Sequence, residues 1–396
     1  MNMKKIYFSI LFLLVLLSSC KQSSSDTNQE ESLIRITIED PEKEKGILYL
    51  SHYFKEARVV PLETKAECLL GEIKKIEMDD NLLFVQDNMG QGICCFNMEG
   101  KFLYRIGILG NGPDELPDIE CFTINKEENV IYLHSRMLQK NKSYSYKGEI
   151  IGEIPCGYSA TEIDFMAGNL YLSSPNGKKD TYNLIGVNAA GKIVEKHEAT
   201  KLDGISPIPI IRKSKNRLYY YPNLLQDTVY TLDGKGSYEP ALIFNCQKYR
   251  MPNEVRERMC NMKTRLSTDY IEIGLNNYTL LDNYVVLPDF IYFSYSFGCI
   301  VYRGFYDKKT KKAVSSRDIC DDVGFLPLGY TKGQTDNQLI TVLSTQKISS
   351  NTEEYYQIVK FTDEQIAADK AQMKRLEKYL NSEEDPNPFV VIYTAK

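Results

Sequence analysis

Few residues of this chain have the types and spacing that catalysis or metal binding would need. Gly107–Pro113 contains three glycines, but it lacks the Lys-Ser/Thr pair and the following helix of a phosphate-binding loop. Glu72 and Glu120 each precede a turn asparagine by nine residues, so both carboxylates could face a common channel and bind Ca²⁺. Solvated surface carboxylates are the favoured interpretation, because the pattern does not recur along the rest of the chain.

The histidines and cysteines form no recognisable catalytic or zinc-binding motif. His52, His134 and His197 are far from one another in the sequence, and none has the context of a catalytic base beside a nucleophile. The ten cysteines include the adjacent pair Cys94 and Cys95 but no C-x₂-C spacing, so buried thiols are favoured over a disulfide framework. We therefore expect no metal and no cofactor. The sequence leaves enzymatic activity open and favours a protein without it.

The elements that would position any functional residue repeat along the chain. The stretch Leu69–Gly107 contains four short apolar runs separated by turn residues, which predicts a four-stranded antiparallel meander. An asparagine directly before an apolar run recurs at intervals of 40 to 67 residues, as Asn81, Asn129, Asn169, Asn216, Asn283 and Asn337. A later glycine turn recurs as Gly100, Gly148, Gly191 and Gly234. Such repeats predict an all-β fold, a six-bladed β-propeller of four-stranded blades.

The first residues have the pattern of a targeting segment rather than of a folded domain. Lys4 and Lys5 precede the apolar run Ile6–Leu17, which is too short to be a permanent membrane-spanning helix. The run ends in Leu17-Ser-Ser-Cys20, which resembles the lipobox of bacterial lipoproteins. That resemblance implies a signal peptide over residues 1–19, a lipidated Cys20 and a polar tether over 20–32, with the lipid held in the outer membrane.

The remaining chain divides into an N-terminal extension, residues 33–55, and the propeller, residues 56–396. Leu33–Glu39 alternates like a strand, and two helical insertions are expected at about 251–270 and 362–381, the second opened by a capping box at Thr362 and Gln365. We expect the sixth blade to close the ring by combining strands from both ends of the chain. These strands are Phe325–Gly329, Gln338–Leu343, Phe389–Tyr393 and Ala57–Leu62.

Four sequence segments together resemble a known family. The segments are Val60–Thr64, Gly107–Leu116, Arg217–Leu232 and Tyr306–Lys312. They are similar to segments of the six-bladed β-propeller lipoproteins of Bacteroidetes, which are related in fold to NHL and TolB-type propellers. The resemblance implies a fold and an envelope location, at the periplasmic or the outer surface, but no catalytic residues.

The expected function is that of a tethered binding or interaction module. The formal net charge of −5 and the lack of a dense basic cluster argue against nucleic acid as a partner. The ligand could be a glycan, a peptide or an envelope protein. A propeller hydrolase or lyase with a metal in the channel and a purely structural envelope component are the alternatives.

Loop length suggests where a ligand would bind. The Asn and Gly turns are tight, whereas longer loops and both helical insertions fall on the opposite face of the ring, and long loops on a rigid scaffold commonly carry recognition residues. We therefore predict ligand binding on the loop face. The candidate residues are Arg105, Asp114, Glu115, Arg136, Tyr221 and Asp227.

Overall fold

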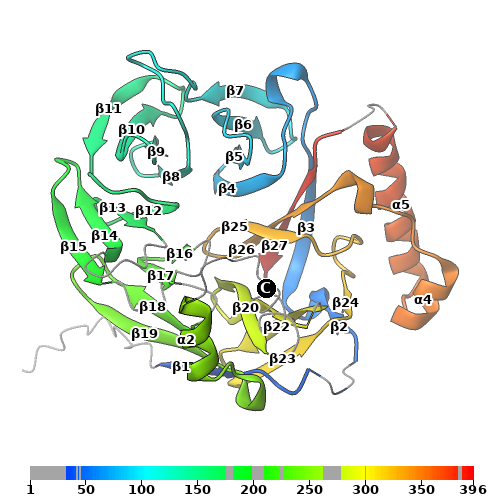
Figure 1. The fold of residues 1–396 in the computed structure, drawn as a ribbon. Helices are drawn as coiled ribbons and strands as arrows, with labels where there is room; N and C mark the ends of the chain where they lie inside the picture. The colour runs from blue at the N-terminus through cyan, green and yellow to red at the C-terminus, as the bar shows by residue number, and fades with distance from the viewer. Residues whose placement is uncertain are drawn as a thin grey trace, which may run out of the picture.

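Six β-sheets stand around a central axis in a computed structural model of the protein, and this confirms the predicted six-bladed propeller (Figure 1). The structure describes residues 33–41, 43, 46–174, 182–198, 209–222, 226–261, 278–298, 300–381 and 386–396. Cys20 and its tether lie outside the described residues, as do most of the loop after Ser173 and the second half of the helix expected at 251–270.

The blades, named A to F in chain order, are antiparallel and each begins with the strand nearest the axis. Blade A contains β4 (Ile73–Asp79), β5 (Leu82–Asp87), β6 (Ile93–Asn97) and β7 (Phe102–Ile106). Blade B contains β8 (Cys121–Asn125), β9 (Val130–Ser135), β10 (Lys140–Ser145) and β11 (Ile150–Pro155). Blade C contains β12 (Glu162–Met166), β13 (Asn169–Ser173), β14 (Tyr182–Asn188) and β15 (Ile193–Glu198).

Of the other three blades, D and F include strands from the ends of the chain. Blade D contains β16 (Ile210–Ser214), β17 (Arg217–Tyr221), β18 (Thr228–Leu232) and β19 (Tyr238–Asn245), with β1 (Ile34–Thr37) added parallel to β19. Blade E contains β20 (Thr279–Val286), β21 (Phe290–Phe297), β22 (Ile300–Asp307) and β23 (Lys312–Ser316). Blade F contains β25 (Tyr330–Gln334), β26 (Gln338–Leu343), β27 (Phe389–Ala395) and β3 (Phe54–Pro61). A short parallel pair, β2 (Leu48–Tyr49) and β24 (Ile319–Cys320), lies beside them.

The turn chemistry explains why the repeats fold as hairpins. The four predicted glycines adopt positive φ values of 72 to 86°, which glycine accepts without steric cost. At Gly100 a Cβ atom would lie 1.8 Å from the carbonyl oxygen of Pro61, so this turn also needs the absence of a side chain. Among the predicted asparagines only Asn129 has a positive φ. In blade A the residue with the positive φ is Asp80, which directly precedes Asn81.

Two predicted positions were wrong. Asn283 does not precede the second strand of blade E, because it lies inside the long first strand β20, whose turn to β21 contains Pro288 instead. The first strand of blade F is β25, not Phe325–Gly329, because the latter segment belongs to the connection from blade E. The first error placed a turn inside a strand, and the second took an apolar run in a connection for a strand.

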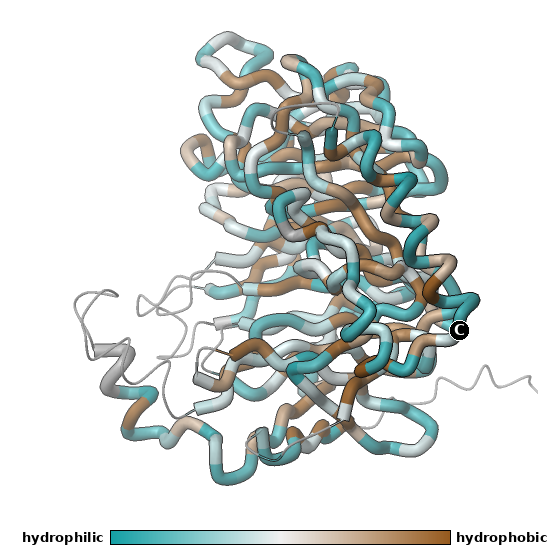
Figure 2. The backbone as a smooth tube through the Cα atoms, turned by 90° about the vertical axis from the view of Figure 1, so that its right-hand side faces the viewer, coloured by the Kyte–Doolittle hydropathy of each residue, from teal (hydrophilic) through white to brown (hydrophobic). Residues whose placement is uncertain are grey.

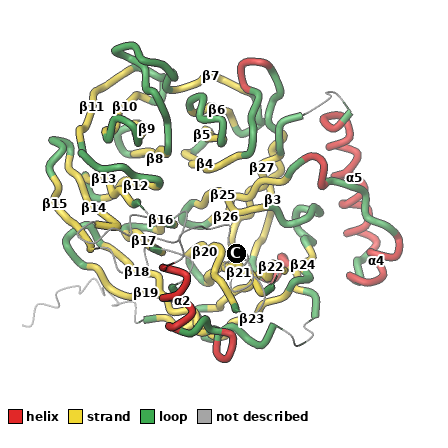
Figure 3. The backbone as a smooth tube through the Cα atoms, viewed as in Figure 1, coloured by secondary structure: helices red, strands yellow, loops and turns green. Residues whose placement is uncertain are grey.

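Helices lie outside the sheets, in the connections. The predicted capping box is present at the start of α5 (Asp363–Leu380). The Thr362 hydroxyl accepts a hydrogen bond from the Gln365 backbone amide, and the Gln365 side-chain oxygen accepts one from the Thr362 backbone amide. The described part of the first insertion is α2 (Asn253–Asn261), and α4 (Glu353–Val359) was not predicted. Figure 3 shows α4 and α5 at the outer side of blade F. Within the described ranges, no helix is long and apolar enough to cross a membrane.

The core consists of six apolar clusters, each of which fills the space between two neighbouring blades. Figure 2 shows the apolar strands in the interior of the disc. The cluster between blades E and F also includes Met373 and Leu376 of α5, so that helix is packed on the propeller. Seven described cysteines are unpaired and buried, as predicted, and burial raises the pKa of Cys94 and Cys95 to about 11.

A buried carboxylate ties the closing strand β27 to the chain between blades E and F. Asp321 accepts hydrogen bonds from the amides of Val323 and Gly324, at 3.1 and 2.7 Å, and from the Tyr393 hydroxyl, at 2.7 Å. Burial raises the pKa of Asp321 to about 6, because removal from water disfavours the charged form.

The free energy of unfolding should therefore fall as pH rises through the pKa of Asp321. An acid with a raised pKa in the folded state binds more protons when folded, so its contribution is complete below about pH 4 and is lost above about pH 6. For Asp321 the loss should be on the order of 3 kcal/mol. Urea unfolding across this pH range should show a smaller decline in Asp321→Asn than in the wild type. Exposed Asp318→Asn is the control, and equal declines in all three proteins would contradict the assignment.

Candidate functional site

Two cavities lined by described residues lie on the axis of the ring. The larger, of about 2330 Å³, opens at the face that carries the first and third turns of the blades, and we call it the vestibule. The smaller, of about 630 Å³, lies on the opposite side and is called the loop-side cavity. Lys75 of β4 and Arg212 of β16 line both cavities, so these two residues mark the waist between them.

Lys75 connects the first strands of three blades. Its ammonium group donates to the carbonyl oxygens of Phe122 in blade B, at 2.9 Å, and Ile163 in blade C, at 3.0 Å. It also lies 2.8 Å from a carboxylate oxygen of Glu77 and 3.9 Å from one of Glu162. Burial lowers the pKa of Lys75, but the surrounding carboxylates outweigh this effect and hold the pKa above its ordinary value. The lysine is thus a permanent cation at the waist.

The floor of the vestibule next to Lys75 is acidic. Glu77 accepts from the backbone amide of Ile124 at 3.0 Å, and Asp164 accepts from the amide of Phe165 at 2.7 Å. Thr123 lies between the two carboxylates, 3.4 Å from Glu77 and 3.5 Å from Asp164. Burial and then the negative charge of Glu77 raise the pKa of Asp164 to about 6. The carboxyl group of Asp164 can therefore change its charge near neutral pH.

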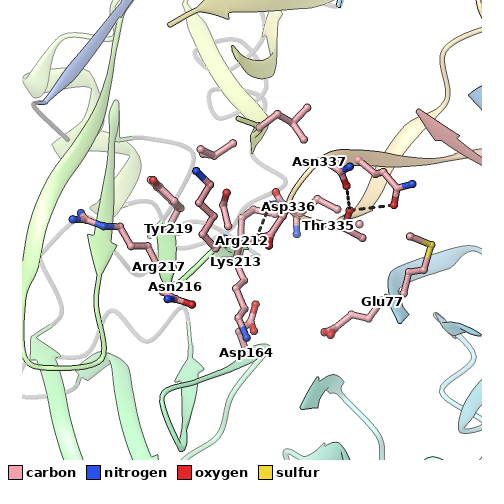
Figure 4. Close-up of a pocket in the computed structure, with 18 of the residues that line it drawn as sticks. Glu77, Asp164, Arg212, Lys213, Asn216, Arg217, Tyr219, Thr335, Asp336 and Asn337 are labelled. Atoms are coloured by element: carbon pink, nitrogen blue, oxygen red, sulfur yellow. Dashed lines mark hydrogen bonds between the residues drawn. The ribbon is translucent and has the colours of Figure 1, made fainter. Parts of the chain in front are cut away.

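The wall contributed by β16 is basic. Arg212 donates to the side-chain oxygen of Asn283 at 3.2 Å, and Lys213 donates to the Phe165 carbonyl oxygen at 3.0 Å. Figure 4 shows Glu77 and the turn at Arg217 on opposite sides of the vestibule, with Arg212 and Lys213 between them. Acidic and basic side chains thus face one another across the axis.

The loop-side cavity contains buried polar atoms without a hydrogen-bond partner among the described residues. They are the side-chain oxygen of Gln86, one carboxylate oxygen of Glu162 and the Nε atom of Arg212. Gln86 is 1 % exposed, and its amide nitrogen donates to the Ile119 carbonyl oxygen at 3.0 Å. Buried polar groups are usually satisfied, so this cavity suits water or polar ligand atoms.

Glu72 and Glu120 do line the loop-side cavity, but each is paired with a lysine. The distances are 3.5 Å from Glu72 to Lys332 and 2.7 Å from Glu120 to Lys74. In the part of the chain that the structure describes, no group of three or more His, Cys, Asp or Glu side chains is arranged to hold a metal.

The structure does not bring the six predicted ligand-binding residues together. Arg105 lies on the outermost strand of blade A and donates to the Glu67 carbonyl oxygen at 2.7 Å. Asp114 and Glu115 lie in the loop between blades A and B. There the Glu115 carboxylate accepts a hydrogen bond from the Gly112 amide at 2.8 Å. Arg136 lies 3.8 Å from Glu120.

The other two predicted residues belong to blade D. Tyr221 is 1 % exposed and donates to the Gln226 carbonyl oxygen at 2.8 Å, while Asp227 forms ion pairs with Arg250 and, at 3.7 Å, with Arg256. Of the six residues only Tyr221 lines either cavity. Ligand binding by these six residues on the loop face stays a prediction. The waist residues were missed, although charges alternating along a first strand, as at Lys75 and Glu77, could have indicated them.

Loss of the waist cation should destabilise the fold strongly. Lys75→Met leaves several buried carboxylates without a counter-charge, and breaking such a cluster costs about 3–5 kcal/mol. The neighbouring Lys74→Met is the matched control, since its pair with Glu120 is partly solvated and should be worth about 1 kcal/mol. Urea unfolding should show the difference. The Lys75→Met loss should also shrink at low pH, where the carboxylates are protonated, and a loss that is small or independent of pH would refute the role.

Comparisons with known proteins place the chain in a family. An inferred exported protein of Bacteroides fragilis has the same fold over 92 % of this chain and 100 % of its own, with 18 % identity and a TM-score of 0.68. A member of the DUF4221 family from Bacteroides vulgatus matches 87 % of this chain and 97 % of its own, with 11 % identity and a TM-score of 0.51. No curated protein matches the sequence. A family model matches residues 33–394, and the chain therefore belongs to the family described as "Domain of unknown function (DUF4934)".

Proposed function

We propose that this protein is an exported, lipid-anchored binding protein without catalytic activity, which takes its ligand into the vestibule. The vestibule itself carries the proposal. Its volume of about 2330 Å³ exceeds the roughly 300–1,000 Å³ of small-molecule pockets, so it can accept a segment of a polymer. Its floor is built on the first strands of the blades, which are held by hydrogen bonds across the ring and form a rigid base.

The chemistry of the waist supports binding rather than catalysis. The Lys75 ammonium group already makes two hydrogen bonds to carbonyl oxygens and an ion pair with Glu77. A group engaged in this way holds three blades together and is not available to a substrate. The exposed lysines and carboxylates on the turns above, such as Lys215 and Glu127, are free to reorient toward a ligand.

Export is supported by two independent observations. Lys4, Lys5 and the apolar run Ile6–Leu17 have the composition of a secretory leader. The Bacteroides fragilis protein of the same fold is itself inferred to be exported. The lipobox-like Leu17-Ser-Ser-Cys20 adds the lipid anchor, and the outer membrane is its proposed location.

The course of β1 connects the proposed anchor to the vestibule. Strand β1 pairs in parallel with β19, which runs from the turn face to the loop face, so β1 begins on the side of the turns. Leu33, Ile34 and Arg35 line the vestibule. A tether of the thirteen residues between Cys20 and Ile34 spans at most about 45 Å when extended. An anchor at Cys20 would therefore keep the vestibule close to the membrane.

Replacing the proposed lipidated residue tests the anchor. Cys20→Ala should abolish metabolic labelling with palmitate and release the protein from the membrane fraction, because an acyl chain contributes about 0.8 kcal/mol for each buried CH₂. Cys68→Ala, which changes a buried thiol, is the control and should keep full labelling. Unchanged labelling of Cys20→Ala would refute the anchor.

A comparison of the two faces tests the binding site. Glycan and peptide arrays would be probed with detergent-solubilised mature protein, and any ligand found would be titrated against two folded double variants. Lys215→Glu with Lys235→Glu changes the vestibule, and Arg105→Ala with Arg136→Ala changes the loop face. We expect the first pair to weaken binding about tenfold or more and the second to leave it unchanged. The reverse result would favour the six loop-face residues, and failure of the wild type to bind any array member would refute the proposed function.

A further inference from the structure

Charges in the vestibule wall are segregated by blade, and the basic half belongs to blades D and E. Among the described residues, these blades, with β1 at the edge of blade D, contribute eight cationic side chains to the wall but only one carboxylate, that of Asp233. The cationic residues are Arg35, Arg212, Lys213, Lys215, Arg217, Lys235, Lys308 and Lys311. Arg35 comes from β1, Arg212 and Lys213 come from the first strand of blade D, and the others lie at the first and third turns of these blades, so they surround one side of the opening.

The acidic half belongs to blades A to C, which follow one another around the other side of the ring. In the part of these blades that the structure describes, six carboxylates and only two lysines, Lys75 and Lys126, line the wall. The carboxylates are those of Glu77, Asp79, Asp80, Glu127, Glu128 and Asp164. Blade F lies between the two halves and is nearly balanced, with Glu56, Arg58 and Asp336.

Apart from that of Lys308, the positive charges of the basic half are not paired with carboxylates of the described chain itself. Leaving Lys308 aside, none of its cations lies within 4.0 Å of a carboxylate in the residues that the structure describes. Charges of one sign gathered on a concave wall focus the field into the cavity and attract groups of the opposite sign. The vestibule should therefore bind anionic groups on the side of blades D and E and cationic groups on the side of blades A to C.

This pattern restricts the chemical class of the ligand. A neutral oligosaccharide would displace water from both halves without replacing its hydrogen bonds to the charged groups, which is costly. Its rings would also find little aromatic surface, because Tyr219 and Tyr306 in the wall are 3 % and 6 % exposed and Phe165 alone among the described lining aromatics is partly exposed. A polymer with charges of one sign, such as an acidic polysaccharide, would match one half and be repelled by the other. A polypeptide can carry both signs within one short segment.

We propose that the vestibule binds a polypeptide segment in which a cluster of acidic side chains and a cluster of basic side chains are separated along the chain. The acidic cluster lies against blades D and E, and the basic cluster lies against blades A to C. This inference rests on the proposed function, because it names the ligand class of the same site. The partner would be an exported or surface-exposed protein that reaches the membrane-proximal face of the propeller.

Binding of designed peptides to the mature protein in detergent tests the inference. Three labelled peptides of equal length would be used, with blocked termini: one with an acidic block joined to a basic block, one acidic and one basic. Fluorescence anisotropy should show that the two-block peptide binds about tenfold or more tightly than either of the others, and that added salt weakens binding. Lys215→Glu with Lys235→Glu and Glu127→Lys with Glu128→Lys should each weaken the two-block peptide about tenfold.

A matched control variant separates the vestibule from the general charge of that face. Lys147→Glu with Lys192→Glu reverses two exposed lysines on third turns of blades B and C, outside the vestibule wall, and should leave binding unchanged. Equal affinity for the acidic and the two-block peptides, or no effect of Glu127→Lys with Glu128→Lys, would refute the inference while vestibule binding stands. The same holds if only a neutral oligosaccharide binds and the lysine variant weakens it. Wild-type protein that binds none of these probes would refute both proposals.

Discussion

The structure depends on the pairing of β3 with β27, which joins the two ends of the chain in one sheet. The register runs from Phe389 opposite Pro61 to Ala395 opposite Phe54, so β3, which precedes the first blade in the sequence, becomes the outer strand of the last blade. Without it, blade F would end at β27 with a row of unpaired backbone groups, which exposes a sheet edge. Val60 of β3 also belongs to the apolar cluster between blades F and A, so this strand helps to hold the last blade against the first.

Ring closure also explains why apolar side chains lie between the blades and polar side chains lie at the axis. The blades diverge with distance from the axis, and the six apolar clusters fill the spaces between them. The first strands converge on the axis, where the ring leaves a channel and carbonyl oxygens of one blade face side chains of the next. Lys75 uses this position, since its ammonium group bonds to carbonyl oxygens of two other blades. Polar residues at the axis therefore hold the blades in register, which apolar contacts alone specify poorly.

Much of the fold could be predicted because it is encoded locally. Turn glycines such as Gly191 and the capping box at Thr362 act over a few residues, so their sequence signals survive in any context. The errors in strand position arose where residues distant in the sequence determine the pairing of the strands. Asn283 lies inside a strand because β20 pairs along most of β21. The missed helix α4 is an exception, because Thr352 caps it locally and two acidic residues follow in its first turn.

The site could be predicted far less well, because its residues come together only through ring closure. Glu77 and Asp164 lie on β4 and β12 but share Thr123 of β8, a contact between three blades that no spacing in the sequence encodes. The Glu162-x-Asp164 and Lys75-x-Glu77 patterns do show charges on alternate residues of first strands, where an apolar face would otherwise be expected. Such alternation identifies residues that face the axis, but not which of them face one another.

Short turns do not by themselves exclude recognition in a closed ring. Long loops on a rigid scaffold commonly carry recognition residues, because tight turns leave little room to vary a surface. A single tight turn such as Lys215-Asn216 does present few side chains, but the ring repeats the turn around one opening, so the turns act as one composite surface. Such a surface varies through residue identity and not through loop length. Its turn backbones are already fixed by hairpin hydrogen bonds, so binding would order side chains alone and would avoid the larger entropy cost of ordering a loop.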